Sequence, residues 1–393
     1  MPRIDAIALY ELLGTRPHIV APRADVGVTP AEARENLLVL TTDDGRQGVA
    51  NWEDPHPDSP PASLSALVGR DPRSLFRLSG SIVCGAVQEM EPLLRDCPPL
   101  DLALLDLVGQ IEGVPLWRLL GPERRKRVPV CYSAIHFEDL LDPDSTVASV
   151  VRRAQEAVAQ GHRALKLKVG RGLKWMSWPE CTERDAEVVR AVREAVGPDI
   201  TLALDGDRGY AGYVADAADF LAEVAPVGLA FVENLVLDHE TAELRNALRA
   251  SDIDVPLAGG DGWDGVGTIG RDALGCPFDV LKLATCKIGL LKHLEAARFA
   301  QENGLSIAPC TSGSQIGMFA GLQLGKVVEA FSRCDCVDTR FDGYEAPGYT
   351  LVEGDYIVPD APGLGVLGSA LDTDPHTHRA PLRRRGEPRT DPT

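Results

Sequence analysis

The sequence predicts an α/β fold, a modified TIM-type (β/α) barrel of seven to eight units with an N-terminal α+β capping domain. From residue 128 onward, short apolar runs alternate with amphipathic stretches that often end in glycine. This alternation is typical of parallel strands joined by crossover helices. Several apolar runs also end in a charged residue, as happens where an active site lies at the carboxyl ends of barrel strands.

The barrel elements are predicted in chain order from two periodicities. Buried parallel strands are near-continuous apolar runs, whereas amphipathic helices repeat apolar residues every three to four positions. We predict strands over 128–135, 164–170, 200–207, 229–235, 255–261, 278–285 and 305–310. We predict helices over 146–161, 183–197, 214–226, 240–251, 266–276, 289–304 and 316–330. Seven strand candidates fit a closed barrel better than an open dinucleotide-binding sheet, because no GxGxxG follows the first strand.

The residues before the barrel predict a smaller module. An apolar strand at the N-terminus leads into a polar loop over 14–27 and a hairpin over 37–52, where Asp44-Gly45 marks the turn. Residues 100–121 are apolar at helical spacing and end in Gly121. The predicted division is a cap over 1–127, the barrel over 128–348, a C-terminal hairpin returning to the cap over 349–371 and a disordered tail over 372–393.

Composition excludes several classes of function. The net charge of −18 disfavours binding to nucleic acid or to an anionic membrane surface. No apolar run reaches the roughly 18 residues of a membrane span. The nine cysteines form no CxxC pair and no zinc spacing. We therefore expect reduced thiols in a cytoplasmic protein.

Charged residues at the strand ends predict the site. Asp205, Glu233 and Asp261 end three successive predicted strands, each 28 residues after the one before. Carboxylates on adjacent strands would converge, and that much like charge is tolerable only around a cation. Upstream, Lys166 and Lys168 share one face of a strand because side chains alternate with period two.

This ordered set resembles the enolase superfamily, on the mandelate racemase and muconate-lactonizing side. The likeness covers about residues 4–367 and includes the capping module, the Lys-x-Lys strand, the acidic strand ends and APCTSGSQIG at 308–317. It implies abstraction of a proton next to a carboxylate, with Mg²⁺ stabilising the enediolate that forms. The resemblance thus implies Mg²⁺ as cofactor, a small anionic carboxylate as substrate and, by analogy, a homo-oligomer.

The resemblance also implies residue roles. Asp205, Glu233 and Asp261 match the Mg²⁺ ligands, although Asp261 stands where glutamate is common. Lys168 matches the base, and Lys166 matches the neighbour that tunes the base and contacts the substrate carboxylate. The candidates for substrate binding are Asp207, Arg208, Cys310, Thr311 and Ser312. Each candidate also has a role that involves no substrate. Arg208 could pair with Asp207, Cys310 could be a small buried residue, and residues 311–314 could form a plain turn.

Two departures from the racemase pattern bear on the reaction. Ala284 and Cys310 stand where an aspartate and its histidine partner are usual, so a two-base proton transfer through histidine is not supported. Lys282, on the sixth predicted strand, is either an acid or base acting from the second face or a barrel-interior lysine paired with a carboxylate.

The leading expectation is a Mg²⁺-dependent dehydratase of a hydroxy acid or sugar acid, in which Lys168 abstracts the α-proton. An epimerase using Lys168 and Lys282 is the enzymatic alternative, and a non-catalytic descendant that keeps the fold is the second class. Substrate determinants are expected on the cap, at 14–27 and around 53–62. The loop over 170–184 is either a specificity wall or an oligomer contact.

Overall fold

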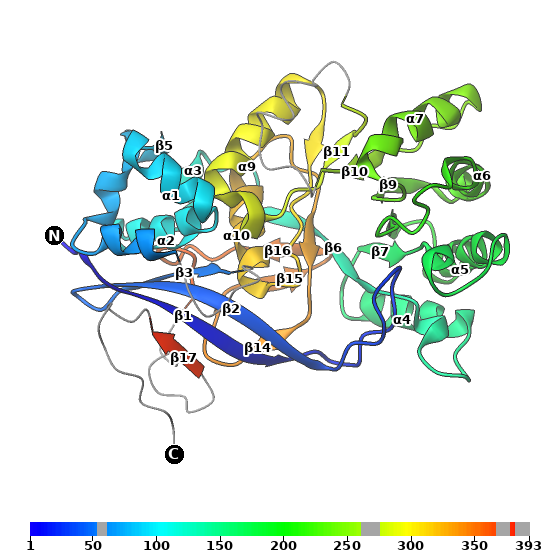
Figure 1. Ribbon diagram of the computed structural model, residues 1–393, viewed down its shortest axis with the longest axis horizontal. Helices are drawn as coiled ribbons and strands as arrows, with labels where there is room; N and C mark the ends of the chain where they lie inside the picture. The colour runs from blue at the N-terminus through cyan, green and yellow to red at the C-terminus, as the bar shows by residue number, and fades with distance from the viewer. Residues whose placement is uncertain (53–60, 261–275, 367–377, 382–393) are drawn as a thin grey trace.

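The computed structural model describes residues 1–52, 61–260, 276–366 and 378–381. The fold is the predicted one, a parallel barrel with an antiparallel N-terminal sheet beside it (Figure 1). Residues 266–275 of the predicted helix, residues 53–60 of the expected loop around 53–62, and Asp261 lie outside the described residues. No helix in the part of the chain that is described is long and apolar enough to cross a membrane.

Eight described strands form the barrel. They are β6 (Arg127–Ile135), β7 (Ala164–Lys168), β8 (Thr201–Asp205), β9 (Leu229–Glu233), β10 (Leu257–Gly259), β11 (Val280–Leu281), β12 (Ser306–Ile307) and β13 (Cys334–Cys336). Neighbours pair in parallel from β6 through to β12. The ring closes because β13 pairs with β6 and the Asp335 N–H donates to the Pro309 carbonyl beyond β12 at 3.0 Å.

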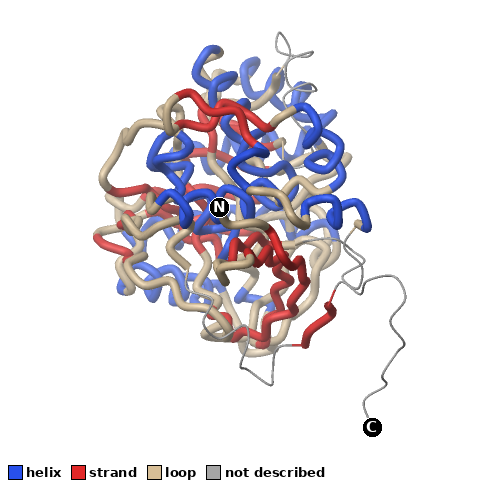
Figure 2. Tube along the Cα trace, turned by 90° about the vertical axis from the view of Figure 1, so that its left-hand side faces the viewer, coloured by secondary structure: helices blue, strands red, loops and turns tan. Residues whose placement is uncertain are grey.

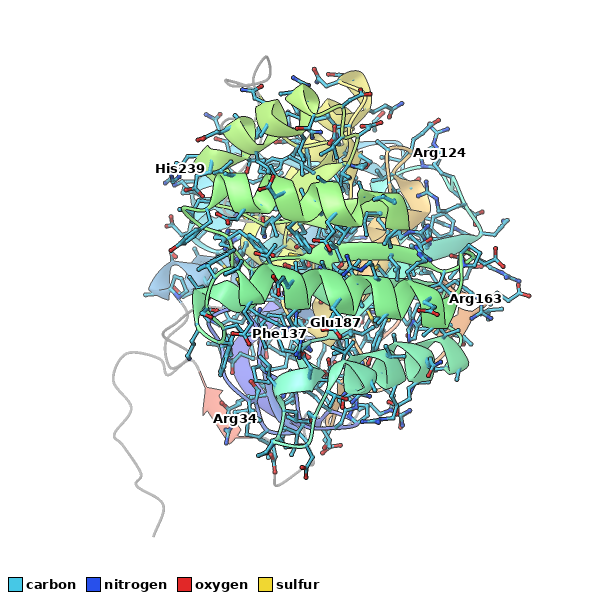
Figure 3. All side chains as sticks on the ribbon, turned by 90° about the vertical axis from the view of Figure 1, so that its right-hand side faces the viewer. Arg34, Arg124, Phe137, Arg163, Glu187 and His239 are labelled. Atoms are coloured by element: carbon cyan, nitrogen blue, oxygen red, sulfur yellow. The ribbon has the colours of Figure 1, made fainter. Side chains whose placement is uncertain are left out.

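Amphipathic helices cover the outside of the barrel. They are α4 (Val147–Ala159), α5 (Glu180–Val196), α6 (Val214–Val224), α7 (Thr241–Ala250), α9 (Thr285–Glu302) and α10 (Gln315–Val327). In α4 the buried residues are Val150, Ala154 and Ala157, the spacing of one helix face. Figure 3 shows the green and teal helices side by side over the strands, as crossover connections require.

The eighth strand, β13, is absent from the sequence-based prediction. Its sequence is Cys334-Asp335-Cys336, and all three residues are buried. A run of three residues with a charge at its centre gives no apolar signal. The prediction also drew β10, β11 and β12 too long, because it took flanking apolar residues as strand.

The cap is built on a three-stranded meander. Strands β1 (Ile4–Thr15), β2 (Glu32–Thr42) and β3 (Gln47–Asn51) pair in antiparallel order. Strands β4 (Phe76–Ser79) and β5 (Ile82–Ala86) form a small hairpin, followed by helices α1 (Glu91–Asp96), α2 (Leu100–Glu112) and α3 (Leu116–Leu120). Helix α2 packs tightly on β3, since a Cβ on Gly48 would lie 2.1 Å from the Ala103 carbonyl oxygen. Figure 2 shows the helices and the antiparallel strands of this side of the molecule.

The C-terminal segment joins the barrel and the cap. Strand β14 (Arg340–Phe341) pairs with β1, and the hairpin of β15 (Thr350–Val352) and β16 (Asp355–Ile357) pairs with β6 of the barrel. The chain then returns to the cap, where the Leu364 N–H donates to Asp106 of α2 at 2.7 Å. Strand β17 (His378–Pro381) pairs with β1. These four residues are therefore a strand, and the expectation of a disordered tail is wrong for them.

The cap lies against the carboxyl ends of the barrel strands. Figure 3 labels His239, which follows β9, on the left of the view and Arg163, which precedes β7, on the right. Phe137, which follows β6, and Arg34 of the cap strand β2 lie toward the same left-hand side as His239. The charged strand ends therefore face the cap.

A buried carboxylate of the cap holds the barrel loop that follows β12. Glu35 of β2 is 5% exposed and accepts hydrogen bonds from the hydroxyl of Ser314, the N–H of Ile316 at 3.3 Å and the hydroxyl of Tyr344 at 3.1 Å. Ser314 also caps helix α10 by accepting from the Gly317 N–H at 2.8 Å. Burial, opposed by these donors, raises the pKa of Glu35 to about 7. This contact fixes the cap over the loop that carries Thr311 and Ser312.

Because Glu35 is buried, its ionisation should make stability depend on pH. Its pKa is higher in the folded chain than in the unfolded chain, so the folded state loses stability as pH rises from about 4.5 through about 7. A Glu35→Gln variant keeps the shape without the charge. Its free energy of unfolding, measured in urea, should gain about 2–3 kcal/mol relative to the parent between pH 5 and pH 8. A difference that is constant over this range would contradict the assignment.

Candidate active site

The charged strand ends of β7, β8 and β9 meet in register. Lys168 pairs with Asp205 across β7 and β8, and Asp205 pairs with Glu233 across β8 and β9. Side chains two residues apart on a strand point the same way, so Lys166 faces the barrel interior with Lys168. The structure therefore brings together four of the predicted residues at adjacent positions.

Lys166 lies at the centre of a buried ion network. Its ammonium is 2.6 Å from Glu233 Oε2, 2.9 Å from Asp335 Oδ2 and 3.2 Å from Asp205 Oδ2. The side chain is 3% exposed. Burial alone would lower its pKa, but the charges of Asp335, Glu233 and Asp205 outweigh burial and raise the pKa well above its usual value. Lys166 therefore stays an ammonium, suited to pair with a carboxylate.

Lys168 lies one step nearer the cap. Its ammonium is 2.8 Å from Asp205 Oδ2 and 2.8 Å from Asp207 Oδ2. Asp207 is in turn 2.9 Å from the Arg23 guanidinium, which the cap loop supplies. Arg23 thus adds a positive charge beside Asp207, from which it is 184 positions away in the sequence.

Lys282 lies on the opposite side of the barrel from Lys168. Strands β8, β9 and β10 separate β7 from β11 on one side, and β6, β13 and β12 separate them on the other. The Lys282 ammonium is 2.8 Å from Asp335 Oδ1 and 3.6 Å from Glu233 Oε2, and its side chain is fully buried. This is the arrangement of a barrel-interior lysine paired with carboxylates, one of the two predicted roles.

The carboxylates have pKa values displaced in opposite directions. Burial, together with the nearby charge of Asp205, raises the pKa of Glu233 to about 7. Burial would also raise the pKa of Asp205, but Lys168 and Lys166 outweigh it and hold the pKa of this carboxyl well below its usual range. Two buried carboxylates at paired positions of adjacent strands are the kind of donor set that a divalent cation stabilises.

The donor chemistry fits Mg²⁺ as far as the described chain reaches. Asp205 and Glu233 supply hard oxygen ligands from adjacent strands, as Mg²⁺ prefers. The third predicted ligand, Asp261, lies just beyond β10 and outside the described residues. Within those residues no group of three or more histidine, cysteine, aspartate or glutamate side chains is placed to hold a metal ion.

A cavity of about 1010 Å³ opens above this network, between the barrel and the cap. The predicted substrate-binding residues Asp207, Arg208, Cys310, Thr311 and Ser312 all line it, as do Lys166, Lys168, Asp205 and Glu233. Arg208 lies 4.0 Å from Asp238 and does not form the alternative salt bridge with Asp207. Burial raises the pKa of the Cys310 thiol to about 12, so this residue stays a neutral thiol.

Three residues of the cavity wall escaped the sequence-based prediction. Asp335 is the carboxylate shared by Lys166 and Lys282. His136, at the carboxyl end of β6, lines the cavity, and burial lowers its pKa to about 3, so the ring is neutral. Arg23 comes from the cap. Two of these residues had a signal in the sequence. His136 is a polar residue just after the first barrel strand, and Asp335 is an aspartate between two cysteines.

The two loops expected near the barrel mouth contact each other. The Trp175 indole N–H donates to the Ala24 carbonyl at 2.8 Å, and the Lys174 ammonium donates to the Asp25 carbonyl at 3.2 Å. The loop over 170–184 therefore holds the cap loop over 14–27 in place above the cavity. This contact within one chain supports the specificity wall rather than the oligomer contact.

Comparisons with known proteins agree with this architecture. The family described as enolase C-terminal domain-like matches residues 149–368. D-galactarolactone cycloisomerase from Agrobacterium fabrum is 27% identical over 382 residues, which cover 91% of this chain and 96% of that protein. L-Ala-D/L-Glu epimerase from Bacillus subtilis is 26% identical over 69% of this chain and 70% of that protein.

A solved structure extends the likeness to nearly the whole fold. Galacturonate dehydratase from Geobacillus sp., in complex with D-galacturonate and 5-keto-4-deoxy-D-galacturonate, superposes with a TM-score of 0.79 at 25% identity. The match covers 94% of this chain and 95% of that chain. The relatives in these comparisons include dehydratases, a cycloisomerase and epimerases. The chain is therefore a lyase or isomerase that belongs to the enolase superfamily, of the mandelate racemase and muconate-lactonizing type.

Proposed function

We propose that this enzyme is a Mg²⁺-dependent lyase that removes the α-proton of a hydroxy-acid or sugar-acid carboxylate and expels the β-substituent. The observation that carries the proposal is the in-register row of Lys168, Asp205 and Glu233 at the floor of the cavity. It places an amine beside carboxylates that suit a divalent cation. A dehydratase is the form of this chemistry that we favour.

Asp205 and Glu233, with Asp261 as the third ligand, would hold Mg²⁺. Bound there, the ion supplies the positive charge that stabilises the two oxygens of an enediolate. Lys166, which remains an ammonium, would pair with one oxygen of the substrate carboxylate. The Lys166 ammonium already contacts three carboxylates of the protein. A substrate carboxylate would take the place of one of them.

The proposed elimination moves one proton twice. The free amine of Lys168 takes the proton from the α-carbon, and the electron pair is held on the carboxylate oxygens. The pair held in the enediolate then moves between the α- and β-carbons to form the double bond, and the bond from the β-carbon to its hydroxyl breaks with its electrons leaving on the oxygen. The Lys168 ammonium returns the proton to the departing hydroxyl, which leaves as water. The enol product tautomerises to a 2-keto acid.

The wall of the cavity favours elimination over epimerisation. Epimerisation needs an acid on the face opposite Lys168, and Lys282, although on that side, is buried against Asp335 and does not line the cavity. Cys310 is a neutral thiol at the position where a histidine is usual. The names of the relatives include dehydratases as well as several epimerases, so the preference for elimination rests on the wall of the cavity.

The position of Lys282 keeps an epimerase as the second candidate. Lys168 and Lys282 stand on strands diametrically opposite in the barrel, the arrangement that a two-base reaction needs. The non-catalytic reading is not favoured, because the similar proteins named here are enzymes. Cytoplasmic localisation and a homo-oligomeric state stay predictions, which cell fractionation and light scattering would test.

Two substitutions should separate the base from the metal site. Lys168→Met removes the amine but no carboxylate, so exchange of the α-proton should fall at least 10³-fold while Mg²⁺ binding persists. Glu233→Gln removes one charged ligand, so Mg²⁺ affinity measured by calorimetry should fall at least 10-fold. Lys126→Met, at an exposed lysine outside the cavity and the network, is the matched control. Loss of Mg²⁺ binding in Lys168→Met, or full exchange activity, would refute the roles.

The products in D₂O should show which reaction occurs. Each member of a panel of aldonates, uronates and aldarates is incubated with enzyme and Mg²⁺ and followed by proton NMR. A dehydratase should give a 2-keto acid from its substrate, without accumulation of an α-deuterated epimer. Deuterium in both epimers, with no keto acid, would select the epimerase. If no member of the panel gives a keto acid or exchanges its α-proton for deuterium, the proposal fails.

A further inference from the structure

The segment after β1 crosses the top of the cavity with alternating side chains. Arg16, His18 and Val20 line the cavity, whereas Thr15, Pro17 and Ile19 are exposed. This is the period of an extended chain, which presents every second side chain to one face. The segment is anchored at its far end by antiparallel pairing of Val20 with Thr29. The cap therefore offers a fixed row of side chains to whatever fills the cavity.

Arg16 is held in place without a carboxylate partner. Its Nη1 donates to the backbone carbonyls of Pro30 at 3.1 Å and Glu32 at 2.8 Å. Among the residues that the structure describes, no acid lies within ion-pair distance of its guanidinium. Other cations of the cavity wall are paired, for example Lys168 with Asp205 and Arg23 with Asp207. Arg16 is thus a positioned cation whose remaining N–H groups are available to an anion.

Arg16 lines the cavity from the cap, just after β1, whereas Lys166 and Lys168 line it from the barrel strand β7. His136, at the carboxyl end of β6, lines the same cavity. Arg16 and His18 both respond to the charge of Asp338, which accepts a hydrogen bond from the Tyr132 hydroxyl at 2.7 Å. Desolvation of the Arg16 guanidinium is a cost that an anionic ligand would offset.

We propose that Arg16 binds the distal carboxylate of a dicarboxylic sugar acid, with His18 beside it as a further hydrogen-bonding group. This inference rests on the proposed function, in which the other carboxylate is bound at the barrel floor. A substrate with one acid at each end places one anion at Lys166 and the other at Arg16. A sugar acid with a single carboxylate leaves the Arg16 cation partly desolvated and unpaired. Arg16 is then the residue that selects dicarboxylates over monocarboxylates.

The test compares acids that differ only at the distal end. D-galactarate is measured against D-galactonate, and D-glucarate against D-gluconate, by keto-acid formation and α-proton exchange in D₂O with the Mg²⁺-loaded enzyme. The parent enzyme should prefer an aldarate. Arg16→Gln should lower kcat/KM for that aldarate 10- to 100-fold, mainly through KM, and change the matched aldonate less than about 3-fold. Arg16→Lys, which keeps the charge but loses the planar fork, should recover part of the loss.

Arg34→Gln is the matched control, because Arg34 is an exposed cap arginine paired with Glu11 and outside the cavity. It should leave both substrates unchanged. Two results overturn the assignment of Arg16 while leaving the lyase intact: an aldonate exchanged faster than its aldarate by the parent, or an equal loss for both acids in Arg16→Gln. Absence of exchange with aldonates, uronates and aldarates alike would instead reject the proposed function, and this inference with it.

Discussion

A buried network of opposite charges at the carboxyl ends of the barrel strands is the constraint on which the rest of this structure depends. Lys166 and Lys282 share Asp335 and Glu233, and Lys168 shares Asp205 with Lys166. Taking such ions out of water costs several kcal/mol each, and only near-complete pairing offsets that cost. The in-register pairing of β7, β8 and β9 is what makes this pairing geometrically possible.

The ion pairs of this network also bear on how its carboxylates and lysines would accept a metal ion and a substrate. Among the described residues of this network, four carboxylates (Asp205, Asp207, Glu233 and Asp335) are balanced by three lysines and by Arg23 of the cap. In the proposed function, a divalent cation held by the carboxylates of residues 205 and 233 would free the two amines of β7 to face an incoming acid. The cap participates directly, because Arg23 completes the balance and Glu35 holds the loop after β12. The cap therefore contributes a charge to the network and a hydrogen-bond acceptor to the loop beside it.

The sequence predicted those strands and site residues that are marked by a pattern of neighbouring residues. Strands β7, β8 and β9 lie within two residues of their predicted ends, because buried apolar runs with charged termini are a strong signal. Asp335 was missed because its strand is three residues long. Arg23 and Glu35 were missed because they reach the barrel from the cap, over 184 and 279 positions, and such contacts leave no periodicity in the sequence. The role of Lys282 depended on a neighbour, Asp335, that was itself unpredicted.

The central claim is that the carboxylates of residues 205 and 233 bind one divalent cation beside the amine of Lys168. A crystal of the enzyme soaked in Mn²⁺, measured above the manganese absorption edge, tests this claim most directly. The account predicts a single strong anomalous peak within about 2.5 Å of an oxygen of each carboxylate, with the Lys168 amine directed into the cavity. A peak elsewhere, or no peak while both lysines of β7 keep their ion pairs, would contradict it.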